Sequence, residues 1–304
     1  MTHLPNKNIY LLGLGALGGL IAAKLHDAFP DSVKIIADLK RQQTIQSGGL
    51  TVNGKSISFQ FIAPGNGHRE ADLIIIAVKN AQLAQAIQDI KSFIGENTMI
   101  ISLLNGISSE EIIGDEIGHK HLLYAYGVGM DAVRDNSGIR YTNPGKIVFG
   151  EKDNHELSER VKFVKELFDK AQIPYNIPVD MNRALWSKFM MNTGINQASA
   201  VLKAPYGAFQ VPGEAYDLMM AAAKEVMELS AHYGVNLNQT DVEDFLRILA
   251  TLDPAGKTSM LQDVEAGRET EADLFAGTVL AMGKKYNLHA PVNEMLYRRI
   301  KSLK

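Results

Sequence analysis

One helical segment carries a lysine and two asparagines at a spacing that suits acid catalysis on a small polar molecule. Between residues 182 and 196, Lys188, Asn192 and Asn196 recur every four residues, so their side chains lie along one face of a helix. A solvent-facing stripe would carry several charges, whereas Lys188 is the only charged residue between 185 and 200. We therefore predict that the two amides orient a small polar ligand.

The apolar surroundings decide what Lys188 can do. Desolvation disfavours the charged ammonium, so the lysine either pairs with a carboxylate or becomes a proton donor with a tunable pKa. The first alternative makes Lys188 a structural residue of the core, and the second makes it a general acid. We favour the general acid.

A glycine-rich turn near the N-terminus predicts a dinucleotide site. The sequence from 13 to 18 reads GLGALG, follows an apolar run at 9–12 and opens a helix expected over 16–28. Gly13 permits a tight turn, Gly15 lets the backbone approach a pyrophosphate, and Gly18 lets the helix pack closely on its strand. Free N–H groups at the helix N-terminus then bind the anion. The predicted cofactor-binding residues of this turn are Gly13, Leu14, Gly15, Ala16, Leu17 and Gly18.

Residues at the end of the second predicted strand, 33–38, help to determine whether NADH or NADPH binds. Asp38 lies where an acidic residue reads the ribose in this fold, which favours a free 2′-hydroxyl and hence NADH. Lys40 and Arg41 follow at once and offer positive charge to the 2′-phosphate of NADPH. The alternative role for Asp38 is to cap the next helix. These residues leave the choice of cofactor open.

Two further apolar runs, 72–78 and 99–104, predict central parallel strands with polar residues at their ends. Lys79 follows the first run and Asn105 the second. Ligands bind at the carboxyl ends of strands in open α/β sheets, so a bound ligand explains these residues better than solvation does. Residues 50–57 contain an Asn-Gly pair that predicts a type I′ hairpin, and 138–141 is expected to pair with 145–150 as a closing antiparallel hairpin.

Composition narrows the class of protein. The chain has 304 residues, 46% of them hydrophobic, which suffices for about two domains. Its net charge of -3 comes from interspersed signs and argues against a nucleic-acid partner. There is no cysteine, and the eight histidines show no metal-binding spacing, so we expect no metal site. The glycine-broken N-terminal run suits neither a signal peptide nor a membrane span, so we expect a cytoplasmic protein.

The pattern of secondary structure changes after Asp180. Strand signals stop there, and the rest of the chain is typical of helices. The extended piece at 173–179, with prolines at 174 and 178, is the expected domain boundary. The predicted fold class is α/β, with an N-terminal Rossmann-type dinucleotide-binding domain over residues 1–178, followed by an all-α C-terminal domain over 179–304.

Several motifs, in this order along the chain, resemble those of the ketopantoate reductase (2-dehydropantoate 2-reductase) family. They are GxGAxG at 13–18, Lys79, Asn105-Gly106, the string Leu-Trp-x-Lys-x-x-x-Asn-x-x-x-Asn at 185–196, and Ser-Met-x-Gln-Asp at 259–263 followed by Thr270-Glu271. The resemblance covers essentially the whole chain. It implies a Rossmann domain, a helical domain and a substrate cleft between them, in which a 2-keto acid is reduced with NADPH.

The resemblance also implies the roles of individual residues. The catalytic residues that it implies are Lys188, as general acid, and Glu271, as a candidate partner of the lysine. The substrate-binding residues that it implies are Asn192, Asn196 and Ser259. The residues that it implies between cofactor and active site are Lys79, Asn105 and Glu271. Two positions depart from the family pattern: Asp38 stands where NADPH-using members commonly have arginine, and Tyr206 stands where a substrate-side asparagine is expected.

Three functions compete on this evidence. The first is NADPH-dependent reduction of 2-dehydropantoate to (R)-pantoate, a step of pantothenate biosynthesis. The second is an NAD-dependent D-2-hydroxyacid dehydrogenase on the same scaffold, which Asp38 keeps open, and the third is a non-catalytic nucleotide sensor. A sensor has no need of a proton donor, so Lys188 disfavours it. The expected partner is a small 2-keto acid, with no nucleic acid and no membrane, and a homodimer is the assembly considered.

Overall fold

The chain divides into two compact units. The computed structural model describes residues 7–65, 69–135 and 137–303. The first unit runs to Leu104 and resumes over Ser109–Met181, and the second consists of Asn105–Ser108 and the chain from Asn182 onward. The four residues 105–108 therefore group with the C-terminal unit, although they follow a strand of the first.

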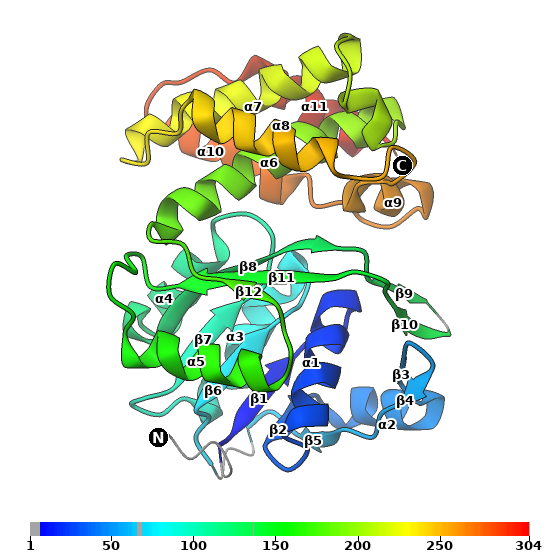
Figure 1. The fold of residues 1–304 in the computed structure, drawn as a ribbon, viewed down its shortest axis with the longest axis vertical. Helices are drawn as coiled ribbons and strands as arrows, with labels where there is room; N and C mark the ends of the chain where they lie inside the picture. The colour runs from blue at the N-terminus through cyan, green and yellow to red at the C-terminus, as the bar shows by residue number, and fades with distance from the viewer. Residues whose placement is uncertain (1–6, 66–68, 136, 304) are drawn as a thin grey trace. The chain divides into compact units, whose positions relative to one another are not determined.

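The first unit is built on an eight-stranded sheet with the order β12-β11-β8-β7-β6-β1-β2-β5 (Figure 1). Its strands pair in parallel, except that β8 and β11 are antiparallel. The strands of this sheet are β1 (Ile9–Leu12), β2 (Val33–Ile36), β5 (Gln60–Ile62), β6 (Leu73–Ile76), β7 (Met99–Ser102), β8 (Leu122–Met130), β11 (Pro144–Gly150) and β12 (Tyr175–Asn176). This mostly parallel sheet agrees with the predicted Rossmann-type domain.

Helices cover both faces of this sheet (Figure 1). The helical elements of the unit are α1 (Ala16–Ala28), α2 (Leu39–Gly48), η1 (Asn80–Gln82), α3 (Leu83–Ile90), η2 (Lys91–Phe93), α4 (Ser109–Ile117), η3 (His119–His121) and α5 (Glu159–Lys170). Successive strand residues point to opposite faces, so Ile9 and Leu11 join the core under α1 and α5, whereas Tyr10 and Leu12 join the core under α3 and α4. Burial on both faces explains why these strands are continuous apolar runs.

A second, four-stranded sheet has the order β4-β3-β10-β9 and packs on α1. Its strands are β3 (Thr51–Val52), β4 (Lys55–Ser56), β9 (Val133–Asp135) and β10 (Gly138–Arg140). Asn53 and Gly54 have φ values of 48° and 77°, so the predicted type I′ hairpin between β3 and β4 is confirmed. The side chain of Ile139 fills the space where a side chain of Gly19 would lie, so Gly19 lets this sheet approach the helix.

The pairing predicted between 138–141 and 145–150 is wrong. β11 pairs with β8, which at nine residues offers a full-length partner, and β10 pairs with β9 instead. Asp131 holds the β8–β11 hairpin together by accepting hydrogen bonds from the backbone N–H groups of Thr142 and Asn143. The strands β9 and β10, which come between β8 and β11 in sequence, therefore belong to the second sheet and not to this hairpin.

The second unit is helical, and the part of it that the structure describes contains no strand, as predicted. Its elements are α6 (Met181–Leu202, whose first residue belongs to the first unit), η4 (Tyr206–Phe209), α7 (Glu214–His232), α8 (Gln239–Ala250), α9 (Ser259–Glu265), the π-helical turn η5 (Asp273–Gly277), α10 (Thr278–Lys284) and α11 (Pro291–Ser302). One apolar core contains residues from α6, α7, α8, η5 and α11, among them Phe189, Met219, Phe245, Phe275 and Ile300.

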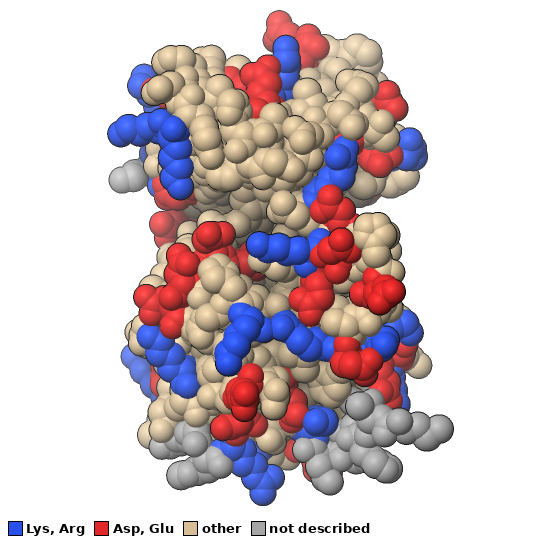
Figure 2. All heavy atoms as spheres, turned by 90° about the vertical axis from the view of Figure 1, so that its left-hand side faces the viewer, with Lys and Arg blue, Asp and Glu red and all other residues tan. Residues whose placement is uncertain are grey.

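Charges of both signs are mixed over the surface. On the face drawn in Figure 2, Lys and Arg side chains alternate with Asp and Glu side chains. This mixture agrees with the small net charge of -3. Among the helices that the structure describes, none combines the length and the apolar character needed to cross a membrane.

Candidate active site

The glycine loop between β1 and α1 is a backbone turn that side chains would obstruct at two positions. Gly13 has a φ of +103°, and a Cβ atom there would lie closer than 3.0 Å to the carbonyl oxygen of Ala77, just after β6. At Gly18 a Cβ atom would collide with the carbonyl oxygen of Gly13 and would lie 2.8 Å from Cβ of Ala77. Glycine at these two positions therefore lets α1 start close to the ends of β1 and β6.

The same loop leaves an open face at the N-terminus of α1. Gly15 is exposed, and a Cβ atom there would meet nothing within 4 Å. In the described part of the chain no side chain caps this helix, and no acidic residue lies in its first turn. β1 lies between β2 and β6, so the loop is at the point where the strand order reverses. An uncapped helix N-terminus at a switch point fits the diphosphate of a dinucleotide.

Asp38 caps α2. Its Oδ1 atom accepts a hydrogen bond of 2.7 Å from the backbone N–H of Arg41, so Asp38 does cap this helix. Its contact with the ribose stays a prediction. The residue is exposed, as are Lys40 and Arg41. Lys79 is also exposed, at the end of β6, where it precedes η1. These residues all lie at the carboxyl edge of the sheet.

In the helical unit, the structure joins two of the residues implied by the motifs. Asn105 Nδ2 donates a hydrogen bond of 3.0 Å to Glu271 Oε2, across 166 positions of sequence. Gly106, with a φ of +87°, lies against Leu274 at the start of the π-helical turn η5. Glu271 accepts this bond where η5 begins, since its backbone oxygen receives the N–H groups of Leu274 and Phe275. π-helical turns occur often at functional sites, and Glu271 lies just before this one.

The polar stripe of α6 is buried and leaves hydrogen-bonding capacity unused. Asn192 and Asn196 are each 6% exposed, and no described residue forms a hydrogen bond with either amide. Lys188 as a whole is only partly buried, yet burial of its amine lowers the pKa of Lys188 to about 8. Within the described residues no ion pair links Lys188 to Glu271, the partner that the resemblance implied. Neither amide is among the buried polar atoms of the described residues that lack a partner, so both groups reach the surface of this unit, where they can bind a polar ligand.

Ser259 and Tyr206 each begin a short helical element of the helical unit. Ser259 is the first residue of α9 and is exposed, while the preceding Thr258 caps the helix by accepting from the N–H of Leu261. Tyr206 begins η4 next to Gly256, and burial raises the pKa of its hydroxyl. Ser259 is thus exposed at a helix start, and its contact with a substrate stays a prediction.

Glu110, in the first turn of α4, is a buried acid that the sequence patterns did not reveal. Ser102, at the end of β7, donates to Ser109 Oγ at 2.9 Å, and Ser109 donates to Glu110 Oε2 at 2.8 Å. Glu110 is 4% exposed, and burial raises its pKa to about 7 against the opposing effect of these hydrogen bonds. In the sequence it looked like an ordinary acidic residue of a helix start, because only the tertiary fold buries it.

We predict that Glu110→Gln makes the protein more stable above pH 7 than the wild type. Between the ordinary pKa of 4.5 and the folded value of about 7, the native state keeps a proton that the unfolded chain releases. The free energy of unfolding therefore falls as pH rises through this window, by about 3 kcal/mol at most, and glutamine removes that loss. Urea denaturation at pH 5 and pH 8 measures the effect, with the exposed neighbour variant Glu111→Gln as control. Parallel pH dependence of all three proteins would contradict the assignment.

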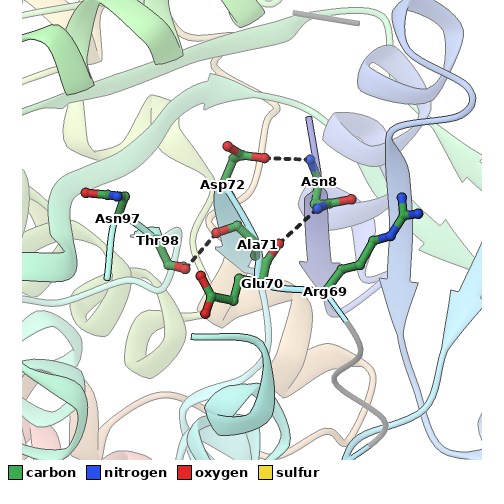
Figure 3. A pocket seen from close by; sticks show the side chains of 7 residues that line it. All are labelled: Asn8, Arg69, Glu70, Ala71, Asp72, Asn97 and Thr98. Atoms are coloured by element: carbon green, nitrogen blue, oxygen red, sulfur yellow. Dashed lines mark hydrogen bonds between the residues drawn. The ribbon is translucent and has the colours of Figure 1, made fainter. Parts of the chain in front are cut away.

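A hollow lies at the amino ends of the strands, at the edge of the sheet opposite the glycine loop. Its lining residues are Asn8, Arg69, Glu70, Ala71, Asp72, Asn97 and Thr98 (Figure 3). Asp72 accepts from Lys7 Nζ and from the N–H of Asn8, and Thr98 Oγ1 donates to the carbonyl oxygen of Ala71. These bonds join the amino ends of β1, β6 and β7, far from the glycine loop at the carboxyl ends.

The sheet, the glycine loop and the helical second unit define a Rossmann-type α/β oxidoreductase architecture. Two family models match the chain: "Ketopantoate reductase PanE/ApbA" over residues 9–154 and "Ketopantoate reductase PanE/ApbA C terminal" over residues 180–304. The chain belongs to the ketopantoate reductase family.

Individual relatives are distant but cover nearly the whole chain. The 2-dehydropantoate 2-reductase of Vibrio cholerae is 27% identical, over 97% of this chain and 97% of that protein. The uncharacterized oxidoreductase YkpB of Bacillus subtilis is 27% identical, over 95% of this chain and 96% of that protein. A solved structure of D-mandelate dehydrogenase with NADH and anilino(oxo)acetate has a TM-score of 0.85 at 22% identity, over 97% of this chain and 98% of that chain. This last likeness shows a shared fold.

Proposed function

We propose that the chain is a 2-dehydropantoate 2-reductase, which reduces 2-dehydropantoate to (R)-pantoate with NADPH in pantothenate biosynthesis. The observation that carries the proposal is the stripe on α6, where Lys188 has a lowered pKa and the amides of Asn192 and Asn196 have no hydrogen-bond partner among the described residues. Membership of the family and the relative in Vibrio cholerae support the choice of substrate.

The proposed roles are those that the family resemblance implies, and the chemistry of ketone reduction supports them. When bound, a nicotinamide cofactor supplies the hydride, and the glycine cradle at 13–18 fits its diphosphate. Lys188 stabilises the negative charge that develops on the keto oxygen and donates the proton. Asn192, Asn196 and Ser259 hold the carboxylate and hydroxyl of the substrate. Asn105 fixes the carboxylate of Glu271, which keeps the second catalytic residue oriented.

The second candidate is an NAD-dependent D-2-hydroxyacid dehydrogenase. Asp38 and the structural likeness to a D-mandelate dehydrogenase solved with NADH favour it. The two candidates share the glycine loop and the α6 stripe and differ in the keto acid and in the cofactor.

Steady-state rates with a panel of 2-keto acids, each with NADPH and with NADH, test the proposal. We expect the highest kcat/KM for 2-dehydropantoate with NADPH. A higher value for an aromatic or unbranched keto acid with NADH would establish the second candidate. Absence of turnover with every pair, together with retained dinucleotide binding, would establish the sensor.

The charge of Asp38 is expected to oppose NADPH. We predict that Asp38→Asn, which keeps a good helix cap, strengthens NADPH binding roughly threefold to tenfold, because it removes a negative charge beside the 2′-phosphate. Asp38→Ala removes both charge and cap, and it should add a loss of stability of about 1 kcal/mol. Fluorescence titration with both reduced cofactors measures the binding. Unchanged NADPH affinity in both variants would mean that this carboxylate does not face the cofactor.

The proposal includes a cytoplasmic enzyme with a small-molecule substrate. The cysteine-free sequence is compatible with a reducing compartment. A homodimer stays a prediction, and sedimentation velocity tests it.

A further inference from the structure

Arg134 lies at the glycine loop although it comes from a different sheet. Its Nη1 atom donates a hydrogen bond to the carbonyl oxygen of Leu14, between the first two glycines of the loop. Arg134 belongs to β9, whose neighbour β10 packs Ile139 onto α1 at Gly19. The second sheet is thus attached to the helix that follows the loop, and this attachment brings the guanidinium to the loop from 120 positions away.

A second guanidinium lies close to the first. Burial and the positive charge of Arg41 together lower the pKa of Arg134, so the two cations repel each other. In the described ranges neither side chain forms an ion pair, and the neighbouring acid Asp135 is occupied by Arg140. Two guanidinium groups near one another, against the single carboxylate of Asp38, leave a net positive charge that an anion would stabilise.

The position of Arg41 and Arg134 in the fold indicates which anion they would bind. β1 and β2 are parallel neighbours, with Leu11 opposite Ile35, so the glycine loop and Asp38 both lie at the carboxyl edge of the sheet. In a dinucleotide fold this is the place of the adenosine ribose, whereas the diphosphate lies at the N-terminus of α1. A phosphate on the ribose would therefore lie near Arg41 and Arg134.

We propose that Arg134, together with Arg41, binds the 2′-phosphate of NADPH and determines the preference for NADPH over NADH. The proposal rests on the NADPH-dependent function proposed above. A guanidinium binds a phosphate through two parallel N–H···O bonds, and two such groups match its double negative charge. The end of the second strand carries the acidic Asp38, and Arg134 supplies a guanidinium to the glycine loop from β9.

Binding measurements on single variants test this inference. Arg134→Ala should weaken the binding of NADPH about tenfold or more and leave the binding of NADH unchanged, while Arg134→Lys keeps part of the affinity. Arg140→Ala, on the neighbouring strand, is the matched control, because Arg140 is exposed and already paired with Asp135. Calorimetry with 2′,5′-ADP and with 5′-AMP isolates the phosphate, since only the first carries it.

The outcomes separate this inference from the proposed function. Selective loss of NADPH and of 2′,5′-ADP in Arg134→Ala, but not in Arg140→Ala, supports it. Equal losses for both cofactors would show that Arg134 only holds the glycine loop, and a wild-type preference for NADPH that survives in Arg134→Ala would overturn the inference alone. If the wild type prefers NADH, both the proposed cofactor and the role of Arg134 are wrong.

Discussion

Lys188→Ala should lose turnover about 100-fold or more and keep its affinity for cofactor. The ammonium makes an interaction that strengthens as charge develops on the keto oxygen, so its loss raises the barrier of the chemical step. The cofactor contacts proposed here lie in the glycine loop and at Arg41 and Arg134, in the other unit of the chain. Measurement of kcat, KM and cofactor Kd on one preparation separates these effects.

The pKa of Lys188 adds a pH signature to this prediction. A general acid must be protonated to act, so kcat of the wild type should fall as pH rises above about 8, the pKa that burial produces. Lys188→Arg keeps the positive charge but cannot give up its proton in this range, so it should retain substrate binding and lose this pH dependence. A wild-type profile that stays flat to pH 9.5 would contradict the assigned role.

The stability of the variant distinguishes a catalytic lysine from a structural one. Because burial lowers the pKa, the folded state disfavours the charged lysine below pH 8, and this penalty disappears as pH rises from 8 towards 10.5. Glu271 is held by Asn105, so removal of the lysine leaves no ion pair broken among the described residues. Lys188→Met should therefore be as stable as the wild type at pH 7, or more so. Lys224→Ala, on α7, is the control for loss of an exposed lysine. A folded Lys188→Ala with near wild-type kcat would refute the proposed mechanism.

The sequence predicted correctly those elements whose conformation depends on residues close together in the chain. The apolar runs at 9–12 and 73–76 are strands because both faces of the sheet are covered by helices, and such burial leaves a continuous signal in the sequence. The Asn53-Gly54 turn is likewise determined by two residues that tolerate positive φ. The stripe on α6 could be predicted from the sequence alone, because residues four apart lie on the same face of any long helix.

Contacts between residues far apart in the chain could not be predicted from such local patterns. The sequence predicted that the strand at 145–150 pairs with the segment at 138–141, the nearest candidate. Its partner is β8, and the hydrogen bonds that Asp131 accepts stabilise the turn between these two strands. The bond between Asn105 and Glu271 spans 166 positions, and only the family resemblance suggested that both residues serve one site. Arg134 and Glu110 gave no local signal, because the tertiary fold creates their surroundings.

Gly15→Ala should abolish tight cofactor binding in a protein that folds normally. Gly15 has a φ of -66°, which alanine adopts readily, and the added methyl group would meet no atom within 4 Å. The melting temperature should therefore stay at the wild-type value. The methyl group nevertheless occupies the open face where the backbone must approach the diphosphate, so we expect Kd for the cofactor to rise about tenfold or more, which is about 1.4 kcal/mol.

Gly18→Ala is the matched variant, because it places the same methyl group three residues further along the same loop and helix. There the group collides with the carbonyl oxygen of Gly13 and lies 2.8 Å from Cβ of Ala77, so α1 must move away from β1 and β6. Overpacking of this kind should cost about 1–3 kcal/mol of folding free energy, and binding should weaken as a consequence. Thermal melts and cofactor titrations on the two variants give opposite patterns: lost affinity at full stability for Gly15→Ala, and lost stability for Gly18→Ala. If Gly15→Ala binds NADPH and NADH as tightly as the wild type does, the loop is a packing device only, and the dinucleotide site must lie elsewhere.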